Sequence, residues 1–271
     1  MMFDSPWIAA ALALFLWWFS TGAILLAVRR ADRHGPAARV WAVLWHLPIL
    51  VLAGVGFLDS LDQATVGGVY LGFLSALALW GWIELTFLTG VVTGPVRTIL
   101  EPGVPEWERF IRAWGTVAYH EILLAVTLLT MIVLSYGQAN TIAVLTFGVL
   151  FGARVSAKLN LYLGVRKINV EFIPEPLNHL PSHFRTARMN WLFPISITAL
   201  SVATGLWLER LWVAESAADI VGYALLSALT ALALLEHWFM VLPLPDEKLW
   251  RWMLPARPQP PQAITTSEDA R

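Results

Sequence analysis

The stretch PWIAAALALFLWWFSTGAILLAVRRADRHGPAAR (6–39) decides the fold class. Residues 6–28 carry no ionisable side chain. At a rise of about 1.5 Å per residue, a helix of that length crosses the roughly 30 Å of hydrocarbon in a bilayer. Four arginines follow within residues 29–39. An apolar run of spanning length that ends in basic residues predicts a transmembrane helix followed by a cytoplasmic connection.

The same pattern recurs along the 271 residues, of which 58% are hydrophobic and 14% charged. Because charged residues make up roughly 25% of a soluble domain, this composition indicates a helical membrane protein. We predict an all-α fold with one transmembrane bundle over residues 1–254 and a disordered cytoplasmic tail over 255–271. The seven spans are expected at about 6–28, 40–58, 65–90, 113–135, 141–163, 191–208 and 220–242.

Basic residues fix the expected orientation, because nearly all of the 18 Lys and Arg lie in alternate connections. They follow the first, third and fifth spans and recur in the tail, whereas the opposite connections hold only Arg210. By the positive-inside rule the N-terminus is outside and the C-terminus cytoplasmic. Two tryptophan-rich segments, PEWERFIRAWG (105–115) and PDEKLWRWML (245–254), are predicted to be interfacial helices on the cytoplasmic side.

Ionisable residues inside the spans form the candidate functional site. Measured from the cytoplasmic ends of the predicted spans, several lie at one depth of roughly 8–11 Å. A charge near the centre of the hydrocarbon costs at least about 2.5–3.5 kcal/mol, so such groups are expected to face the bundle interior and one another. The predicted polar layer comprises His46, Glu84, His120, Glu121, Arg154, Lys158, Glu236 and His237.

Three interpretations of this layer remain open. It is a buried network of ion pairs and hydrogen bonds that fixes helix registry, since three carboxylates nearly balance two cations. Alternatively it binds a tetrapyrrole pigment or haem, with His46, His120 or His237 as a metal ligand and Arg154 near a propionate. Tryptophan-rich walls suit a flat apolar ring.

The third interpretation is a di-iron-type metalloenzyme acting on a lipophilic substrate. Its ligands would be Glu84, His120, Glu121, Glu236 and His237. Two features weigh against it: adjacent helical residues point about 100° apart, and the Glu-x-x-His signature of di-iron bundles is absent.

Other classes of function find little support in the sequence. A net charge of −1 gives no basic field for nucleic acid. The absence of cysteine excludes disulfides and thiolate chemistry. A transporter is disfavoured because the outer half of the spans holds no matching groups. The loop 164–190 is long enough to be a docking surface or a lid over the polar layer, and we expect its His179 and His183 at the surface.

Two stretches carry a family resemblance: FGARVSAKLNLYLGVRKINVEFIPEPLNHL (151–180) and LEHWFMVLPLPDEKLWRW (235–252). They resemble the photosynthetic complex assembly proteins of purple bacteria, of the PuhE type, whose gene accompanies that of the reaction-centre H subunit. The similarity runs from the first span to about residue 254. The tail after 255 lies outside it.

The resemblance implies a multi-pass protein of the bacterial inner membrane, cytoplasmic or intracytoplasmic. Its implied role is non-enzymatic: assembly of reaction-centre and light-harvesting complexes, or modulation of bacteriochlorophyll supply. The implied partners are the lipid bilayer and photosynthetic complex subunits or pigment-synthesis proteins, and bacteriochlorophyll is the pigment that the polar layer would bind. The resemblance assigns no catalytic residue.

Overall fold

The computed structural model of the chain describes residues 2–168, 170 and 173–242. Over these residues the protein has nine α-helices and a few short 3-10 turns, and its only β-type pairing there is an isolated bridge between Val165 and Thr186. Seven of the helical segments are long and apolar enough to cross a membrane. The prediction of a helical membrane protein with seven such segments is therefore confirmed.

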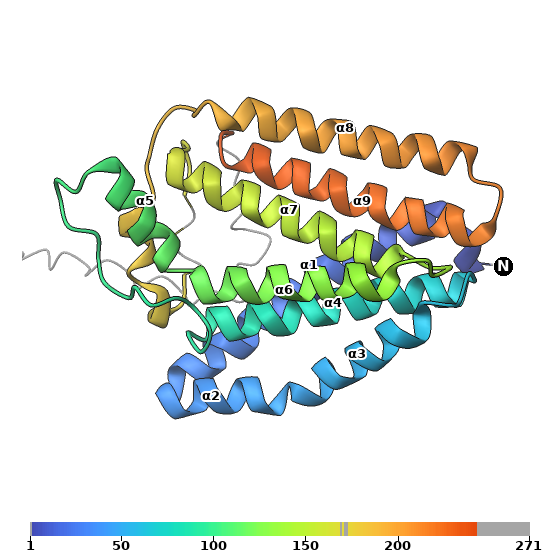
Figure 1. Cartoon of the computed structure of the whole chain (residues 1–271), viewed down its shortest axis with the longest axis horizontal. Helices are drawn as coiled ribbons and strands as arrows, with labels where there is room; N and C mark the ends of the chain where they lie inside the picture. Colours follow the sequence, from blue (N-terminus) through green and yellow to red (C-terminus); the bar gives the residue numbers. More distant parts are fainter. Residues whose placement is uncertain (1, 169, 171–172, 243–271) are drawn as a thin grey trace, which may run out of the picture.

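The spanning helices run side by side along the long axis of the molecule (Figure 1). Their bounds are α1 (Pro6–Arg33), α2 (Pro36–Trp45) with α3 (Leu47–Ser60), α4 (Val66–Leu88), α6 (Ala118–Ser135), α7 (Ile142–Leu163), α8 (Leu192–Val213) and α9 (Ala217–Phe239). The remaining helix, α5 (Glu106–Gly115), is too short to span.

The second span differs from its expected form, because it is broken at His46 into α2 and α3. Pro48 lies in the first turn of α3. A proline has no N–H to donate and its ring crowds the preceding turn, so it is tolerated at a helix start and interrupts a continuous helix. His46 consequently occupies a helix junction rather than the middle of a span.

The fourth span also begins later than expected, at Ala118 rather than at 113. The preceding residues belong to α5, which ends at Gly115 where the Thr116 hydroxyl donates to the carbonyl of Ala113. The segment predicted as an interfacial helix at 105–115 is thus a separate helix. The second such segment, 245–254, and the predicted tail, 255–271, lie outside the described residues.

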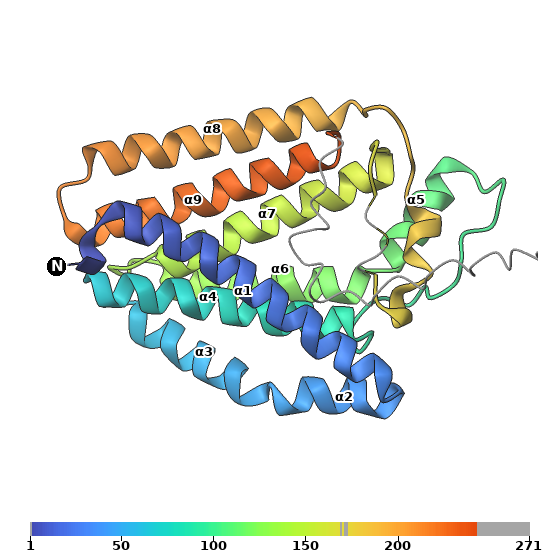
Figure 2. The same cartoon turned by 180° about the vertical axis from the view of Figure 1, so that it is seen from behind.

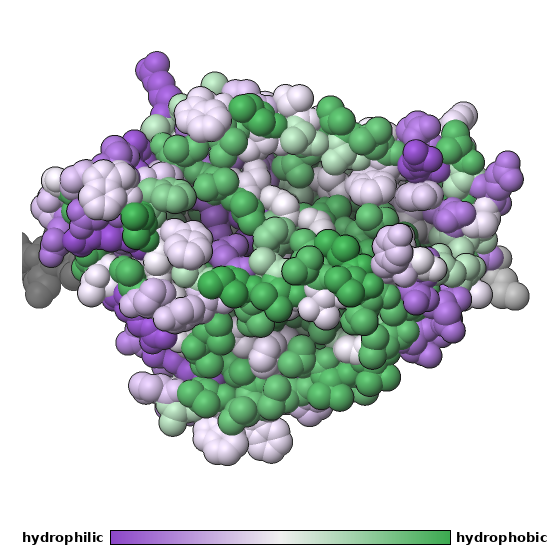
Figure 3. Space-filling model, in the orientation of Figure 1, coloured by the Kyte–Doolittle hydropathy of each residue, from purple (hydrophilic) through white to green (hydrophobic). Residues whose placement is uncertain are grey.

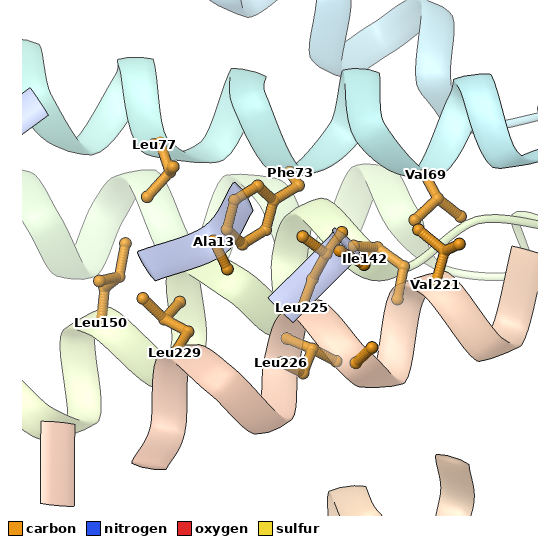
Figure 4. Packing of buried hydrophobic residues seen from close by; sticks show 12 residues of the cluster. Ala13, Val69, Phe73, Leu77, Ile142, Leu150, Val221, Leu225, Leu226 and Leu229 are labelled. Atoms are coloured by element: carbon orange, nitrogen blue, oxygen red, sulfur yellow. The ribbon is translucent and has the colours of Figure 1, made fainter. Parts of the chain in front are cut away.

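The main core lies where α1, α4, α7 and α9 meet (Figure 4). Phe73 of α4 and Leu225 of α9 are completely buried there, beside Ala13 of α1. Small residues let the helices approach closely. A Cβ at Gly222 would lie 2.6 Å from the terminal methyl carbon of Ile142, so the glycine lets α9 pack closely against this side chain of α7.

The topology places alternate connections at opposite ends of the bundle (Figures 1 and 2). The connections 34–35, 89–117 and 164–191 lie together at one end, which we call the α5 end. The chain's N-terminus and the connections 61–65, 136–141 and 214–216 lie at the other. A belt of apolar side chains covers the middle of the face seen in Figure 3, with polar surface at both ends.

Candidate functional site

Three spans bring ionisable residues together near the α5 end of the bundle. Arg154 and Lys158 project from one face of α7, since residues four apart on a helix are neighbours. Arg154 donates from Nη2 to Oε2 of Glu84 on α4 at 2.7 Å. Lys158 is hydrogen-bonded to Glu121 on α6 through its Nζ. Two ion pairs therefore join α7 to α4 and α6.

These ion pairs differ in their exposure. The Glu84 side chain is 9% exposed, whereas that of Arg154 is 34% exposed. The Lys158 ammonium is half-buried and lies 5.1 Å from the centre of the Phe87 ring, close enough for a cation–π contact. The cluster is thus sheltered by protein at its carboxylates and more open on the side of Arg154.

His120 completes the inner side of the cluster. It is fully buried on α6 and stacks on Phe87 with 4.4 Å between ring centres. Its Nε2 lies 3.6 Å from Oε1 of Glu84, longer than a hydrogen bond. Within the described part of the chain, neither ring nitrogen of His120 nor this carboxylate oxygen has a hydrogen-bond partner. The pair is close enough to interact electrostatically, and a small movement would join it.

His237 belongs to a separate arrangement on α9. Its ring is 2% exposed, and its Nδ1 lies 2.8 Å from the carbonyl oxygen of Ala233. Because a carbonyl only accepts, Nδ1 carries a proton. In the neutral ring Nε2 is then the lone-pair nitrogen and accepts from the Ser156 hydroxyl, 2.9 Å away on α7. The backbone of α9 fixes both the tautomer and the direction of the lone pair.

A large cavity lies beside these residues, with a volume of about 810 Å³. Its walls come from α1, α4, α7 and α9, and α5 and the loop 164–190 contribute at the α5 end. The lining is largely apolar and includes Trp17 and Trp80. The polar groups in the lining include Glu84, Glu121, Arg154, Lys158, Glu236 and His237. In Figure 3 recessed polar surface is visible among apolar side chains in the part of the belt nearer α5.

Most of the predicted polar layer thus meets in one place, and His46 does not. The ring of His46 is half-buried and is not part of the cavity lining. Its Nδ1 donates to the carbonyl of Ala42, 2.6 Å away. Pro48 in the first turn of α3 interrupts the helix just before it, so His46 lies at the junction of α2 and α3. Glu236 lines the cavity next to His237.

A cap made of α5 and the loop 164–190 closes the α5 end. Arg109 is buried and donates from Nη2 to the carbonyls of Tyr162 and His183 at 2.9 and 3.1 Å. At the surface Arg185 bonds to Glu106, at 2.5 Å. A further ion pair joins Arg39 of α2 to Glu175 of the loop. The attachments of the cap thus include one buried arginine and two exposed ion pairs.

The expectation that His179 and His183 lie at the surface is wrong. They are 7% and 3% exposed, and His183 donates from Nε2 to the carbonyl of Thr98 at 3.2 Å. Burial lowers the pKa of both imidazoles, and positive charges nearby lower it further. By contrast, the hydrogen bond from Arg185 holds the pKa of the Glu106 carboxyl below its ordinary value.

The described residues include no group of three histidine, aspartate or glutamate side chains placed to hold a metal ion. Glu84 and Glu121 are engaged by cations instead, and His120 and His237 belong to different arrangements. The di-iron interpretation of Glu84, His120, Glu121, Glu236 and His237 gains no geometric support.

The polar layer predicted from the sequence contains only ionisable residues, so it leaves out several uncharged polar residues near the site. Asn160 is completely buried in α7 and donates from Nδ2 to the Ser156 carbonyl and the Ser196 hydroxyl of α8, both at 2.9 Å. Asn190 bonds to the end of α7 through Asn160 and the Gly164 carbonyl. The sequence does place Asn160 within an apolar span. Because an unpaired amide in hydrocarbon is costly, this position indicates a buried hydrogen-bond partner.

Comparison with known proteins places this arrangement in a family. The family described as "Protein of unknown function (DUF3623)" matches residues 2–261. A relative from Rhodobacter capsulatus, described as "Uncharacterized 30.4 kDa protein in puhA 5'region", is 52% identical over 261 residues, which cover 96% of this chain and 95% of the relative. No solved structure matches the chain. The chain belongs to the DUF3623 family.

Proposed function

We propose that the protein is a non-enzymatic membrane factor of the PuhE type, acting in assembly of photosynthetic reaction-centre and light-harvesting complexes or in the supply of bacteriochlorophyll to them. The observation that carries the proposal is the position of the relative's gene in the puhA 5' region. The sequence resemblance to proteins whose gene accompanies that of the reaction-centre H subunit also supports the proposal. A relative this similar over nearly the whole chain makes a shared role the simplest expectation.

The proposal includes an orientation. Because the connections after the first, third and fifth spans are rich in arginine, the α5 end would face the cytoplasm and the N-terminus the opposite side of the bacterial inner membrane. α5 would then lie in the headgroup region, with Trp107 and Ile111 exposed toward it. Photosynthetic complex subunits or pigment-synthesis proteins would meet the cap from the cytoplasm, and lipid would surround the apolar belt.

Two properties of the site support a handling role over catalysis. Two of the cations that line the cavity, Arg154 and Lys158, are each paired with a carboxylate, so neither is an isolated charge awaiting a reacting group. The cavity wall is mainly apolar, as expected for a site that holds a membrane-soluble molecule. Of the predicted pigment contacts His46, His120, His237 and Arg154, the last two line the cavity.

Deletion of the gene in a phototrophic host tests the proposal. We expect membranes of the deletion strain to show altered absorption bands of the reaction-centre and light-harvesting complexes, or an altered bacteriochlorophyll content, under phototrophic growth. A plasmid copy of the gene should restore the wild-type spectrum, and the Glu215→Gln variant, changed at an exposed position, should restore it equally. A deletion strain with unchanged spectra, pigment content and growth would refute the role.

A further inference from the structure

The lining of the cavity changes in character along the axis of the bundle. Near the middle of the spans it is largely apolar, with Leu77 of α4 and Leu229 of α9 on its walls. Toward the α5 end it becomes charged. Glu84 follows Leu77 by seven residues and Glu236 follows Leu229 by seven, a distance of roughly 10 Å along each helix. A site that is apolar at one end and charged at the other fits an amphiphile whose head points toward α5.

The charges of the lining balance one another, so their distribution decides which head group fits. Within the described residues, the lining holds three cations and three carboxylates, namely Arg154, Lys158 and Lys167 with Glu84, Glu121 and Glu236. The side chain of Arg154 is 34% exposed and that of its partner Glu84 is 9% exposed. For Lys158 and its partner Glu121 the fractions are 22% and 16%. The cation is the more accessible member of each pair, so a molecule in the cavity meets positive charge on α7.

Arg154 also keeps donors that its ion pair does not use. A guanidinium carries five N–H donors. In Arg154, Nη2 donates to Oε2 of Glu84, and the buried Nε has no hydrogen-bond partner among the residues that the structure describes. The planar fork of a guanidinium matches the oxygens of a carboxylate or a phosphate. Arg154 can therefore hold Glu84 and a second oxyanion at once.

Part of the lining reaches the outer surface of the protein. In the described part of the chain, the exposed residues of the lining are all apolar: Phe110 and Trp114 of α5, and Leu159 of α7. In the proposed orientation α5 lies in the headgroup region of the membrane. An apolar edge at that depth favours exchange of a ligand with the lipid rather than with water.

We propose that this cavity binds a long-chain amphiphile with an oxyanion head, a carboxylate or a phosphate, taken up from the membrane. The head accepts hydrogen bonds from Arg154 and Lys158, and the chain lies against the apolar lining toward the middle of the spans. The volume of about 810 Å³ is within the roughly 300–1,000 Å³ of small-molecule sites. The inference goes beyond the proposed function, because it assigns a ligand to the cavity whether or not the protein acts in assembly.

Two ligands that share a chain and differ in the head provide the test. The purified full chain in phosphatidylcholine nanodiscs is titrated at pH 8 with hexadecyl phosphate and with hexadecanol, each corrected for its partition into empty nanodiscs. We expect hexadecyl phosphate to bind about tenfold or more tightly, because only its head is an oxyanion. Palmitate, which carries a carboxylate on a chain of the same length, should also bind more tightly than hexadecanol.

Nanodiscs that contain phosphatidylglycerol identify the source of the ligand. If an anionic phospholipid occupies the site in the membrane, it will compete and weaken the binding of hexadecyl phosphate. If the site takes single-chain amphiphiles only, the affinity will stay the same after the same correction against empty nanodiscs. Either result supports an oxyanion site and says which molecule fills it.

Variants of the ion pair locate the head group. Glu84→Gln should bind hexadecyl phosphate several-fold more tightly than the wild type and hexadecanol equally, because Arg154 has lost its internal carboxylate. The double variant Glu84→Gln, Arg154→Gln should lose most of the preference for the charged ligand. A purely structural role of the pair would change the binding of both ligands alike. Arg210→Gln, which removes an exposed cation of α8, is the control and should bind as the wild type does.

Equal affinity of the wild-type protein for hexadecyl phosphate and hexadecanol would overturn the inference, and that comparison does not depend on any variant folding. A preference that persists unchanged in the double variant would also overturn it. The proposed function fails separately, through the deletion strain. Loss of complexes on deletion together with no head-group preference in the titration would leave the assembly role and remove the ligand.

Discussion

Glu84 is the residue on which the charged cluster depends. Its carboxylate receives Arg154 through Oε2, and its Oε1 faces His120 at 3.6 Å. Removing one partner of a buried ion pair lowers stability strongly, because the other charge stays buried with neither its partner nor solvating water. Removing both partners can leave the stability nearly unchanged. The value of the pair is therefore clearest from a comparison of single and double variants.

We expect Glu84→Gln to lower the free energy of unfolding by about 2–3 kcal/mol, less than the roughly 3–5 kcal/mol of fully buried pairs because Arg154 is one-third exposed. The double variant Glu84→Gln, Arg154→Gln should recover at least half of that loss. Thermal unfolding in a fixed detergent measures both. Glu215→Gln, at an exposed position near the opposite end, is the control and should change stability little. Additive losses in the double variant would show that the two residues are not coupled.

His183 gives the cap a dependence on pH. Burial lowers its pKa, and the nearby guanidinium groups of Arg109 and Arg112 act in the same direction, against the hydrogen bond to the Thr98 carbonyl. The unfolded segment therefore binds more protons than the folded one just below the ordinary histidine pKa of about 6.5. The stability of the cap is complete above that pH and decreases as the pH falls through the window beneath it.

Hydrogen exchange of the loop 173–190 should accordingly be faster at pH 5.5 than at pH 7.5, after correction for the intrinsic rate. The His183→Gln variant should lose part of this difference, and the double variant His179→Gln, His183→Gln should lose most of it, because burial lowers the pKa of both imidazoles. The Glu106 carboxyl cannot produce it, because its lowered pKa keeps its bond to Arg185 intact until the solution is more acidic still. Protection that does not change between the two pH values would contradict the assignment.

At the scale of elements, the cap is attached through contacts of very different strength. Arg109 of α5 is buried and donates to the carbonyls of Tyr162 and His183, and its guanidinium lies 4.1 Å from the centre of the Tyr162 ring. The bond between Arg185 and Glu106 is exposed, and exposed pairs contribute little. The buried arginine, rather than the surface pair, should decide whether the cap stays closed.

Arg109→Ala should therefore open the cap, and Arg185→Ala should not. The first change leaves the carbonyls of Tyr162 and His183 without the arginine donor. A buried carbonyl that loses its hydrogen bond costs about 1–3 kcal/mol of stability. The second removes an exposed contact only. Limited proteolysis of the loop 164–190 in detergent, with a protease that does not cleave at arginine, compares the two variants. Similar cleavage rates in both would mean that α5 does not hold the loop.

The same elements show how far the sequence could predict the structure. Hydropathy and length predicted the spanning segments, because each must satisfy its own backbone hydrogen bonds in hydrocarbon. Grouping ionisable residues by their depth in the spans predicted that Glu84, Arg154 and Lys158 lie near one another, as the structure has them. It misplaced His46, because a single proline redirects the chain and depth along a helix says nothing about the direction of a side chain. Burial of His179 and His183 could not be predicted, since it depends on how the loop folds over α5.

At the scale of the whole molecule, the arginine-rich connections and the apolar belt support the orientation proposed above. With the adjoining helix ends, the connections at the α5 end hold 11 of the 18 basic residues, whereas the connections at the N-terminal end hold none. Insertion with the opposite orientation would carry these arginines across the bilayer, which the positive-inside rule disfavours. The cap would then lie on the cytoplasmic side, where soluble partners can reach it.

Single cysteines test this orientation on a clean background, since the chain has no cysteine of its own. Gln138→Cys places a thiol at the N-terminal end, and Glu101→Cys places one at the α5 end, both at exposed positions. In intact spheroplasts a membrane-impermeant maleimide should label Gln138→Cys alone, and after permeabilisation it should label both. The reverse pattern would put α5 outside, which would remove the cytoplasmic cap as a docking surface while leaving the internal geometry of the cavity unchanged.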